Sequence, residues 1–202
     1  SSKGVRTRER LVEAAREIFE TQGFTEARIS DIAERAGQSH GSFYYYFDSK
    51  EEVFREVAAA VDDQLFAPLD DVIMAKSWLA PQQRIREAMR RHLESYRQHA
   101  RIMALIEQVS RHDAEVNALR MARHKRHTDE VTKSIRQMQR RKIADASLDP
   151  AIVATAFGAL THRFAEIWLV HGAVECSLEH AVEQLSRLFE NALRLKPPPR
   201  KA

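Results

Sequence analysis

The chain has 202 residues, of which 44% are hydrophobic and 30% are charged, so it is long enough for one or two globular domains and too apolar for wholesale disorder. Its longest apolar runs are only a few residues, far short of the roughly 18 that a membrane span needs. Residues 1–10 are polar and basic, unlike a secretory signal, and Cys176 is the single cysteine. These features predict a cytoplasmic protein without an intrachain disulfide.

The net charge of +3 is a weak sign of an anionic partner, and its distribution does not locate one. Residues 1–60 hold 9 Lys or Arg against 11 Asp or Glu, a net charge of −2, whereas residues 61–202 carry +5. A nucleic-acid-binding interpretation must therefore rest on particular residues.

Apolar residues recur at spacings of three and four along the whole chain, which predicts an all-α protein of about nine helices. Capping residues and glycines set the expected bounds of the first four. These are Thr7 to Gly23, Ser30 to Gly37, Ser39 to about Phe47, and a fourth helix that starts at a capping box of Ser49 and Glu52.

Two prolines, Pro68 and Pro81, interrupt the pattern in the middle of the chain. A short helix is expected between them, around residues 71–78, and Pro81 suits the first turn of a helix that reaches about His99. The remaining helices are expected over residues 102–110, 113–143, 149–172 with Asp149 as N-cap, and 177–195 with Ser177 as N-cap.

The most informative segment is residues 30–50, SDIAERAGQSHGSFYYYFDSK. Two short helices flank a turn at residues 37–39, and the small face of Ile32, Ala33 and Ala36 matches Phe43 and Phe47, four residues apart on the second helix. This pattern predicts a helix-turn-helix, in which the second helix enters the DNA major groove.

The same segment resembles the N-terminal domain of the TetR family of transcriptional regulators. The matching residues are Asp31-Ile32-Ala33, Ala36-Gly37, Ser39, Gly41, Phe43, Tyr44, Phe47 and Lys50-Glu51. The resemblance covers about residues 8–60. It implies a three-helix DNA-binding domain, assigned here to residues 1–52, followed by a helical domain for effector binding and dimerisation over residues 53–202.

The candidate DNA contacts lie on and beside the second of these helices. Backbone N–H groups after the Ser39 cap are free to face a phosphate, and the Tyr45 ring is expected to point away from the core toward a base. The full set is Ser30, Ser39, His40, Gly41, Ser42, Tyr44, Tyr45, Tyr46 and Lys50. Ser30 enters by the resemblance alone. The alternative for the tyrosines is a half-buried surface without a partner.

The basic residues of the N-terminal segment are a further candidate contact. Lys3, Arg6, Arg8 and Arg10 give it a local positive charge, which suits a neighbouring phosphate or minor groove. A solvated tail is the alternative.

For the remaining two thirds of the chain, the resemblance implies an effector pocket among the middle helices and a dimer of subunits. Aromatic, Met and His residues at helical spacing are the pocket candidates, with plain core as the alternative: His92, Tyr96, Met103, Met121, Phe157, Phe164 and Trp168. The last two helices carry apolar residues on several sides and are expected to form a four-helix dimer interface through Val153, Leu160, Ile167, Val182, Leu185 and Phe189, with an intrachain core as the alternative.

These features predict a ligand-responsive, homodimeric DNA-binding regulator, a repressor released from a palindromic operator by a small apolar or amphipathic effector. Residues 111–142 carry a net charge of +6, which could receive an anionic, acyl-CoA-like effector; the alternative is a solvated basic face on a long helix. An activator or architectural DNA-binding protein without effector is the alternative. No catalytic constellation is apparent, so an enzyme is not expected. No cofactor is expected, and no metal, because His124 and His127 lack further ligands.

Overall fold

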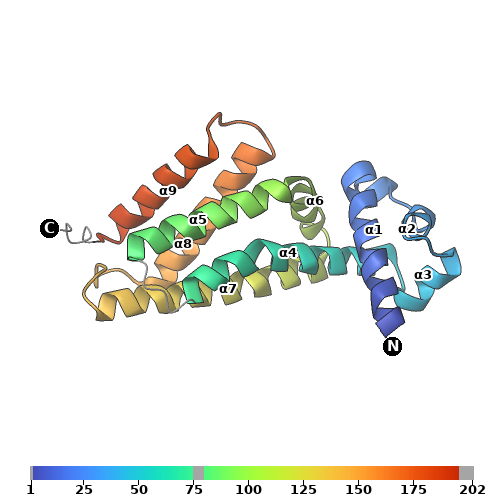
Figure 1. The fold of residues 1–202 in the computed structure, drawn as a ribbon, viewed down its shortest axis with the longest axis horizontal. Coiled ribbons are helices and arrows are strands. Elements are labelled where there is room, and N and C mark those ends of the chain that lie inside the picture. The colour runs from blue at the N-terminus through green and yellow to red at the C-terminus, as the bar shows by residue number, and fades with distance from the viewer. Residues whose placement is uncertain (1, 75–79, 196–202) are drawn as a thin grey trace. The chain divides into compact units, whose positions relative to one another are not determined.

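The computed structural model describes residues 2–74 and 80–195, and in these ranges it contains nine α-helices and no strand (Figure 1). The all-α expectation is confirmed. The described residues form two compact units. Unit 1 consists of the residues up to Asp63 together with Arg101–Met121, and unit 2 of Gln64–Ala100 and the residues from Ala122 onward. These units are defined by packing; the expected functional boundary between residues 52 and 53 stays a prediction.

Unit 1 contains α1 (Ser2–Glu26), α2 (Ile29–Arg35), α3 (His40–Tyr46), the first half of α4 (Lys50–Met74), most of α6 (Ala100–Ser110) and the beginning of α7 (Ala114–Arg140). Aromatic rings form its centre. Phe19 meets Phe54 edge to face at 5.1 Å between ring centroids, and Phe24 meets Phe54 at 4.9 Å. α1 packs on α2, and α2 packs on α3. This packing fixes α3 against a rigid support.

Two expected caps in unit 1 are wrong. α1 starts at Ser2 and not after Thr7, whose hydroxyl donates to the Lys3 carbonyl within the helix. α2 has Arg28 at its N-cap position, and the Ser30 hydroxyl donates to the Asp31 carboxylate instead. The expected interruption at Gly23 is confirmed, because its backbone has φ +80° and is not helical; a short helical turn follows as far as Glu26. Local pairing of short polar side chains explains both errors.

The helix α4 passes through Pro68, so the expected break at this proline is wrong. Proline has no N–H to donate to the carbonyl four residues earlier, that of Gln64. In this structure the Ser95 hydroxyl of α5 (Pro81–Gln98) donates to the Gln64 carbonyl at 3.0 Å. A tertiary hydrogen bond thus replaces the missing helical one. The short helix expected at residues 71–78 overlaps the end of α4, and its later part lies outside the described residues.

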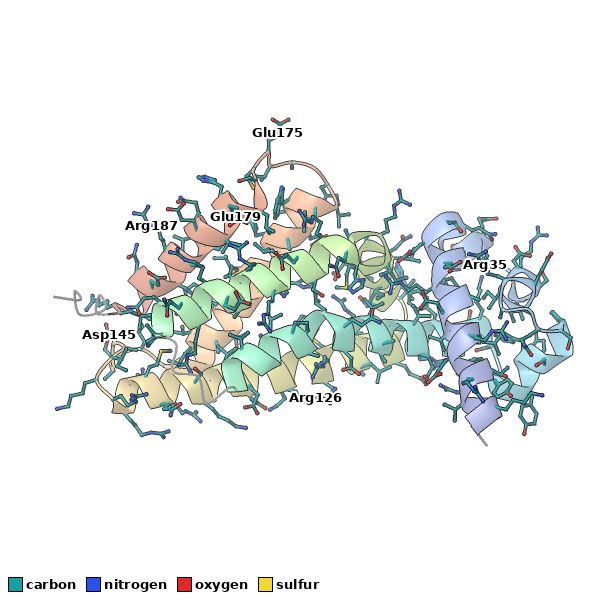
Figure 2. All side chains as sticks on the ribbon, in the orientation of Figure 1. Arg35, Arg126, Asp145, Glu175, Glu179 and Arg187 are labelled. Atoms are coloured by element: carbon teal, nitrogen blue, oxygen red, sulfur yellow. The ribbon has the colours of Figure 1, made fainter. Side chains whose placement is uncertain are left out.

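Unit 2 is built around α5, with α9 (Leu178–Ala192) alongside it and α8 (Pro150–Leu169) also in contact (Figure 1). Arg90 of α5 donates two hydrogen bonds of 2.5 Å to Glu179, which lies at the start of α9 (Figure 2). The expected caps are confirmed here. The Asp149 carboxylate accepts from the first backbone N–H groups of α8, and the Ser177 hydroxyl accepts from the His180 N–H.

Among the residues that the structure describes, no helix is both long enough and apolar enough to cross a membrane.

Candidate nucleic-acid interface and effector cavity

The turn between α2 and α3 depends on Gly37, which has φ +66°. A Cβ atom at this position would lie 3.0 Å from the guanidinium of Arg10, so side-chain-bearing residues are disfavoured by both backbone strain and space. Arg10 donates to the Ala36 carbonyl at 2.7 Å. The turn is therefore held by a left-handed glycine and by a cation from α1, which together set the angle between the two short helices.

The two faces of α3 differ sharply in exposure. Phe43 and Phe47 are completely buried, whereas Tyr45 is 82% exposed and Tyr44 is 48% exposed. Tyr46 is half-buried, and its ring meets the Tyr45 ring at 5.0 Å between centroids. Tyr44 and Tyr45 thus place two consecutive exposed aromatic side chains on α3, and contiguous apolar surface is typical of contact sites. The outer face of α3 therefore has the features of a contact surface.

The N-terminal turn of α3 is open on its outer side. The Ser39 hydroxyl accepts from the Ser42 backbone N–H at 3.1 Å, which confirms the expected cap. His40 and Gly41 are exposed, and a Cβ atom on Gly41 would meet nothing within 4 Å. Ser42 is less available than expected, because its hydroxyl donates to the Gln38 side chain. Gln38 was not expected from the sequence to take part.

Lys50 serves the fold of unit 1 in this structure. Its ammonium group donates to the carbonyls of Thr25 and Ala27, at 3.1 and 3.0 Å, and lies 4.9 Å from the centre of the Phe24 ring. The carbonyls at the end of α1 have no helical partners, so Lys50 acts as their cap. An ammonium group has three protons, which leaves one for the phosphate contact expected from the sequence.

Replacing Lys50 with methionine is expected to lower the free energy of unfolding by about 1–3 kcal/mol, because two charge-assisted hydrogen bonds are lost while the aliphatic stem is kept. DNA binding should weaken equally for all sequences, and the dependence of log Kd on log salt concentration should fall by about one. Chemical denaturation and DNA titrations at several salt concentrations measure the two effects. The control is Lys125→Met, on α7. A salt dependence equal to that of the wild type would restrict Lys50 to the fold.

Residues 3–10, expected to form an N-terminal arm, belong to α1, so the alternative prediction of a solvated tail is wrong for these residues. Arg8 pairs with Glu56 at 2.7 Å and its guanidinium lies 4.8 Å from the centre of the Phe47 ring; the bond with Glu56 raises the pKa of Arg8. Arg10 is bound at the turn. These two cations stabilise unit 1, and Arg35 of α2 (Figure 2) likewise pairs with Glu17.

Unit 2 contains an apolar cavity of about 130 Å³ between α4, α5, α7, α8 and α9. Most of its wall is aliphatic or aromatic, with Phe157 of α8 and Phe189 of α9 in ring contact. The polar lining residues are Arg84, His92, His124, His127, Thr128, Ser134, Thr161 and His162.

Four histidines gather at one part of the cavity wall. The His124 and His162 rings meet edge to face at 5.3 Å between centroids, and the Phe66 ring lies 5.2 Å from His124 and 4.9 Å from His127. His92 is 5% exposed, and neither of its ring nitrogens has a hydrogen-bond partner. Burial, together with the neighbouring histidines, lowers the pKa of His92 to about 3, so this imidazole is neutral.

The cavity includes two of the seven candidate pocket residues, His92 and Phe157. Tyr96, Phe164 and Trp168 belong to unit 2 but do not line it, although the Tyr96 ring lies 5.3 Å from that of His162. Met103 is buried within unit 1, and Met121 is half exposed there. These five residues do not line this cavity, because helical spacing cannot tell which interior gap a side chain borders, and their part in effector binding stays a prediction. His162 and Arg84 line the cavity but were not among the pocket candidates. For Arg84, the available signal was its spacing of four and eight residues from Ala88 and His92, which places it on the same helix face.

The expected dimer residues also need correction. Val182 and Leu185 are buried inside one subunit, where α9 packs on α5, and Val153 and Phe189 pack against the core of Ile135, Met138 and Leu193. Of the six expected residues Leu160 is the most exposed, at 44%, and Val153, Ile167 and Phe189 are half-buried. The exposed apolar residues of these helices are instead Ile152 and Leu188, at 70% and 53%, with Leu160, Ala156 and Ala159.

The pair of short helices α2 and α3, with the outer face of α3 exposed, is the arrangement of a helix-turn-helix protein. The family described as bacterial regulatory proteins, tetR family, matches residues 11–57. The N-terminal segment of the chain is thus similar to this family, and the relatives that match it are named as transcriptional regulators.

One relative is the helix-turn-helix-type transcriptional regulator YdgC of Bacillus subtilis (strain 168), 48% identical over 56 residues, which are 28% of this chain and 29% of that protein. The match thus spans less than a third of that relative's length. Two solved structures share the whole fold. A TetR-family structure from Mesorhizobium loti has a TM-score of 0.81 at 18% identity, covering 95% of this chain and 98% of that one. A structure from Saccharomonospora viridis, described as a regulator in complex with choline, has a TM-score of 0.76 at 20% identity, covering 96% and 100%.

Proposed function

We propose that this protein is a cytoplasmic, ligand-responsive transcriptional regulator that represses its genes by binding a palindromic operator as a homodimer. The observation that carries the proposal is the contrast on α3, where Phe43 and Phe47 are fully buried while Tyr45 is 82% exposed. A helix anchored by its inner face presents its outer residues to the bases of a major groove. The family of the N-terminal segment supports the same role.

The candidate DNA contacts that are exposed in the structure are Ser30, Ser39, His40, Gly41, Tyr44 and Tyr45. Tyr45 is assigned to base reading, since an aromatic ring makes apolar contact with a thymine methyl group. Tyr44 and Tyr46 supply hydroxyl groups for phosphates. In a symmetric dimer the two copies of α3 read half-sites about one turn apart, roughly 34–36 Å.

The unit 2 cavity is the proposed effector site. A cavity of about 130 Å³ is similar in size to an engineered cavity that holds benzene, roughly 150 Å³. It therefore favours a compact, mostly apolar effector over a bulky acyl-CoA-like one. Release from DNA requires that the effector bind the operator-bound and free conformations with different affinity. The choline complex of the Saccharomonospora viridis structure supports small-molecule binding in this fold.

The proposal is tested by incubating the protein with sheared genomic DNA from its source organism and sequencing the fragments that it retains at moderate salt. Recovery of one short palindrome is the expected result, and a retained population without an enriched sequence contradicts sequence-specific regulation. Small-molecule extracts added before retention then test responsiveness. Retention that no extract changes indicates a DNA-binding protein without effector.

Replacing Tyr45 with alanine is expected to change the retained sequence while leaving the melting temperature within about 2 °C, because an 82% exposed side chain contributes little to folding. Each base contact contributes about 1–3 kcal/mol of discrimination, so preference at one position of the half-site should relax at least severalfold. The readout is selection from a randomised operator. The comparison variant is Tyr46→Phe, which keeps the ring beside Tyr45, removes only the hydroxyl assigned to a phosphate, and should leave the preferred sequence unchanged. Identical preferences for Tyr45→Ala and wild type would exclude base reading by Tyr45.

A further inference from the structure

Among the residues that the structure describes, the lining of the unit 2 cavity includes basic side chains and no carboxylate. The polar lining residues are Arg84, four histidines and three residues with hydroxyl groups, and the other described lining residues are apolar or glycine. A cationic molecule would find no opposite charge in this wall, and burying an unpaired cation in apolar surroundings is costly. A molecule that carries a negative charge, in contrast, has a permanently charged partner in Arg84.

His92 marks one polar position in the cavity. Buried polar atoms in folded proteins nearly always have hydrogen-bond partners, yet both ring nitrogens of His92 have none, and the side chain is 95% buried. Its pKa of about 3 keeps the ring neutral, with one N–H donor and one acceptor nitrogen. The complementary group is uncharged and can accept or donate a hydrogen bond, as a hydroxyl does.

Arg84 marks a second polar position. It precedes His92 by eight residues on α5, which places the two on one face of the helix and about 12 Å apart along its axis. Burial and the nearby positive charge of Arg141 lower the pKa of Arg84. Across the described residues, no carboxylate forms an ion pair with Arg84. A half-buried guanidinium beside a second one binds a planar carboxylate with two parallel hydrogen bonds.

We infer that the effector is a compact organic acid with an apolar middle, whose carboxylate pairs with Arg84 and whose hydroxyl group hydrogen-bonds with His92. The inference rests on the proposed function, since it takes the cavity to be the effector site. The remaining apolar lining residues, which include Met89 and Phe157, would surround the body of such a molecule. The two polar positions then select for length as well as charge.

The test measures binding by calorimetry to the full-length protein without DNA. The probes are para-hydroxyphenylacetate, phenylacetate without the hydroxyl, para-hydroxyphenylacetamide without the charge, the cation tyramine, and hydroxy fatty acids of increasing chain length. The acids with a hydroxyl group should bind tightest, and loss of either polar group should weaken binding roughly tenfold or more. The amine should bind weakest.

Two substitutions assign the contacts. Arg84→Met should erase the difference between acid and amide, and His92→Leu should erase the difference between hydroxylated and plain acid. The matched controls are Arg86→Met and His180→Leu, at exposed positions on α5 and α9 that do not line the cavity. Both controls should retain the wild-type ranking of the probes.

Several results would overturn the inference. These are an amide or amine that binds as tightly as the acid, a ranking that neither cavity substitution changes, or no binding of any acid in the series. None of them bears on operator recovery, which tests DNA binding separately. Conversely, acid binding by a protein that enriches no DNA sequence would support the assignment of the cavity to an organic acid while contradicting the proposed function.

Discussion

Replacing Ile152 with glutamate is expected to convert a dimer into monomers and to lower operator affinity by about a hundredfold or more. Ile152 is 70% exposed and lies with the exposed residues Leu160, Ala156 and Ala159 on one face of α8. In a twofold interface each substitution occurs on both subunits, so two carboxylates would be buried without partners. A monomer then binds a single half-site and loses the additional affinity that a dimer obtains by binding both half-sites at once.

Sedimentation at micromolar concentration and operator titration measure the two effects. Leu160→Glu should act similarly. The matched control is Met121→Glu, which places the same charge on a 50% exposed apolar residue of unit 1. If Ile152→Glu still sediments as a dimer, the subunits associate through another surface. If it is a monomer that binds the operator as tightly as the wild type, dimerisation is not needed for recognition.

Lowering the pH from 7 to 5 is expected to reduce the free energy of unfolding by about 2 kcal/mol through His92. The folded-state pKa of His92, about 3, lies below the value of roughly 6.5 in an unfolded chain. Between these values the unfolded state binds the proton and the folded state does not. Stability is therefore fully present above pH 6.5 and declines as the pH falls toward 3.

The variant His92→Leu should lose this pH-dependent part and should also be about 1–3 kcal/mol more stable at pH 7, because it removes two buried polar atoms without partners. Urea denaturation at pH 7, 6 and 5 measures both effects. His180→Leu, at an exposed site, should follow the wild-type curve. A His92→Leu variant with the wild-type pH dependence would contradict a neutral, buried imidazole. Greater stability together with altered ligand selection would show that His92 is retained for binding at the expense of stability.

The helix-turn-helix was predictable because its determinants are local. Gly37 needs a left-handed backbone, Ser39 caps the next helix, and Phe43 and Phe47 repeat at the spacing of one helical turn. Each of these signals acts within a few residues, so it can be read from the sequence. The caps of α8 and α9 at Asp149 and Ser177 were predictable for the same reason.

At Pro68 and Lys50 the structure shows partners that are distant in the chain and that the sequence did not predict. Pro68 does not end α4, because Ser95 of another helix satisfies the Gln64 carbonyl. The sequence predicts that Lys50 contacts a DNA phosphate. In the structure its ammonium group also caps two carbonyls that lie more than twenty residues away in the chain. Polar side chains have several acceptable partners, and only the folded chain selects one of them.

The all-α class, the helix-turn-helix and the outward position of Tyr45 could be predicted from local pattern, since periodicity and capping are properties of neighbouring residues. Which apolar faces are covered and which stay open depends on how separate helices pack. Helical spacing shows that α9 has an apolar stripe, but not that α5 of the same subunit covers Val182 and Leu185 while Ile152 and Leu188 stay exposed. It likewise shows four histidines without showing that they share one cavity wall, because that depends on how separate helices pack.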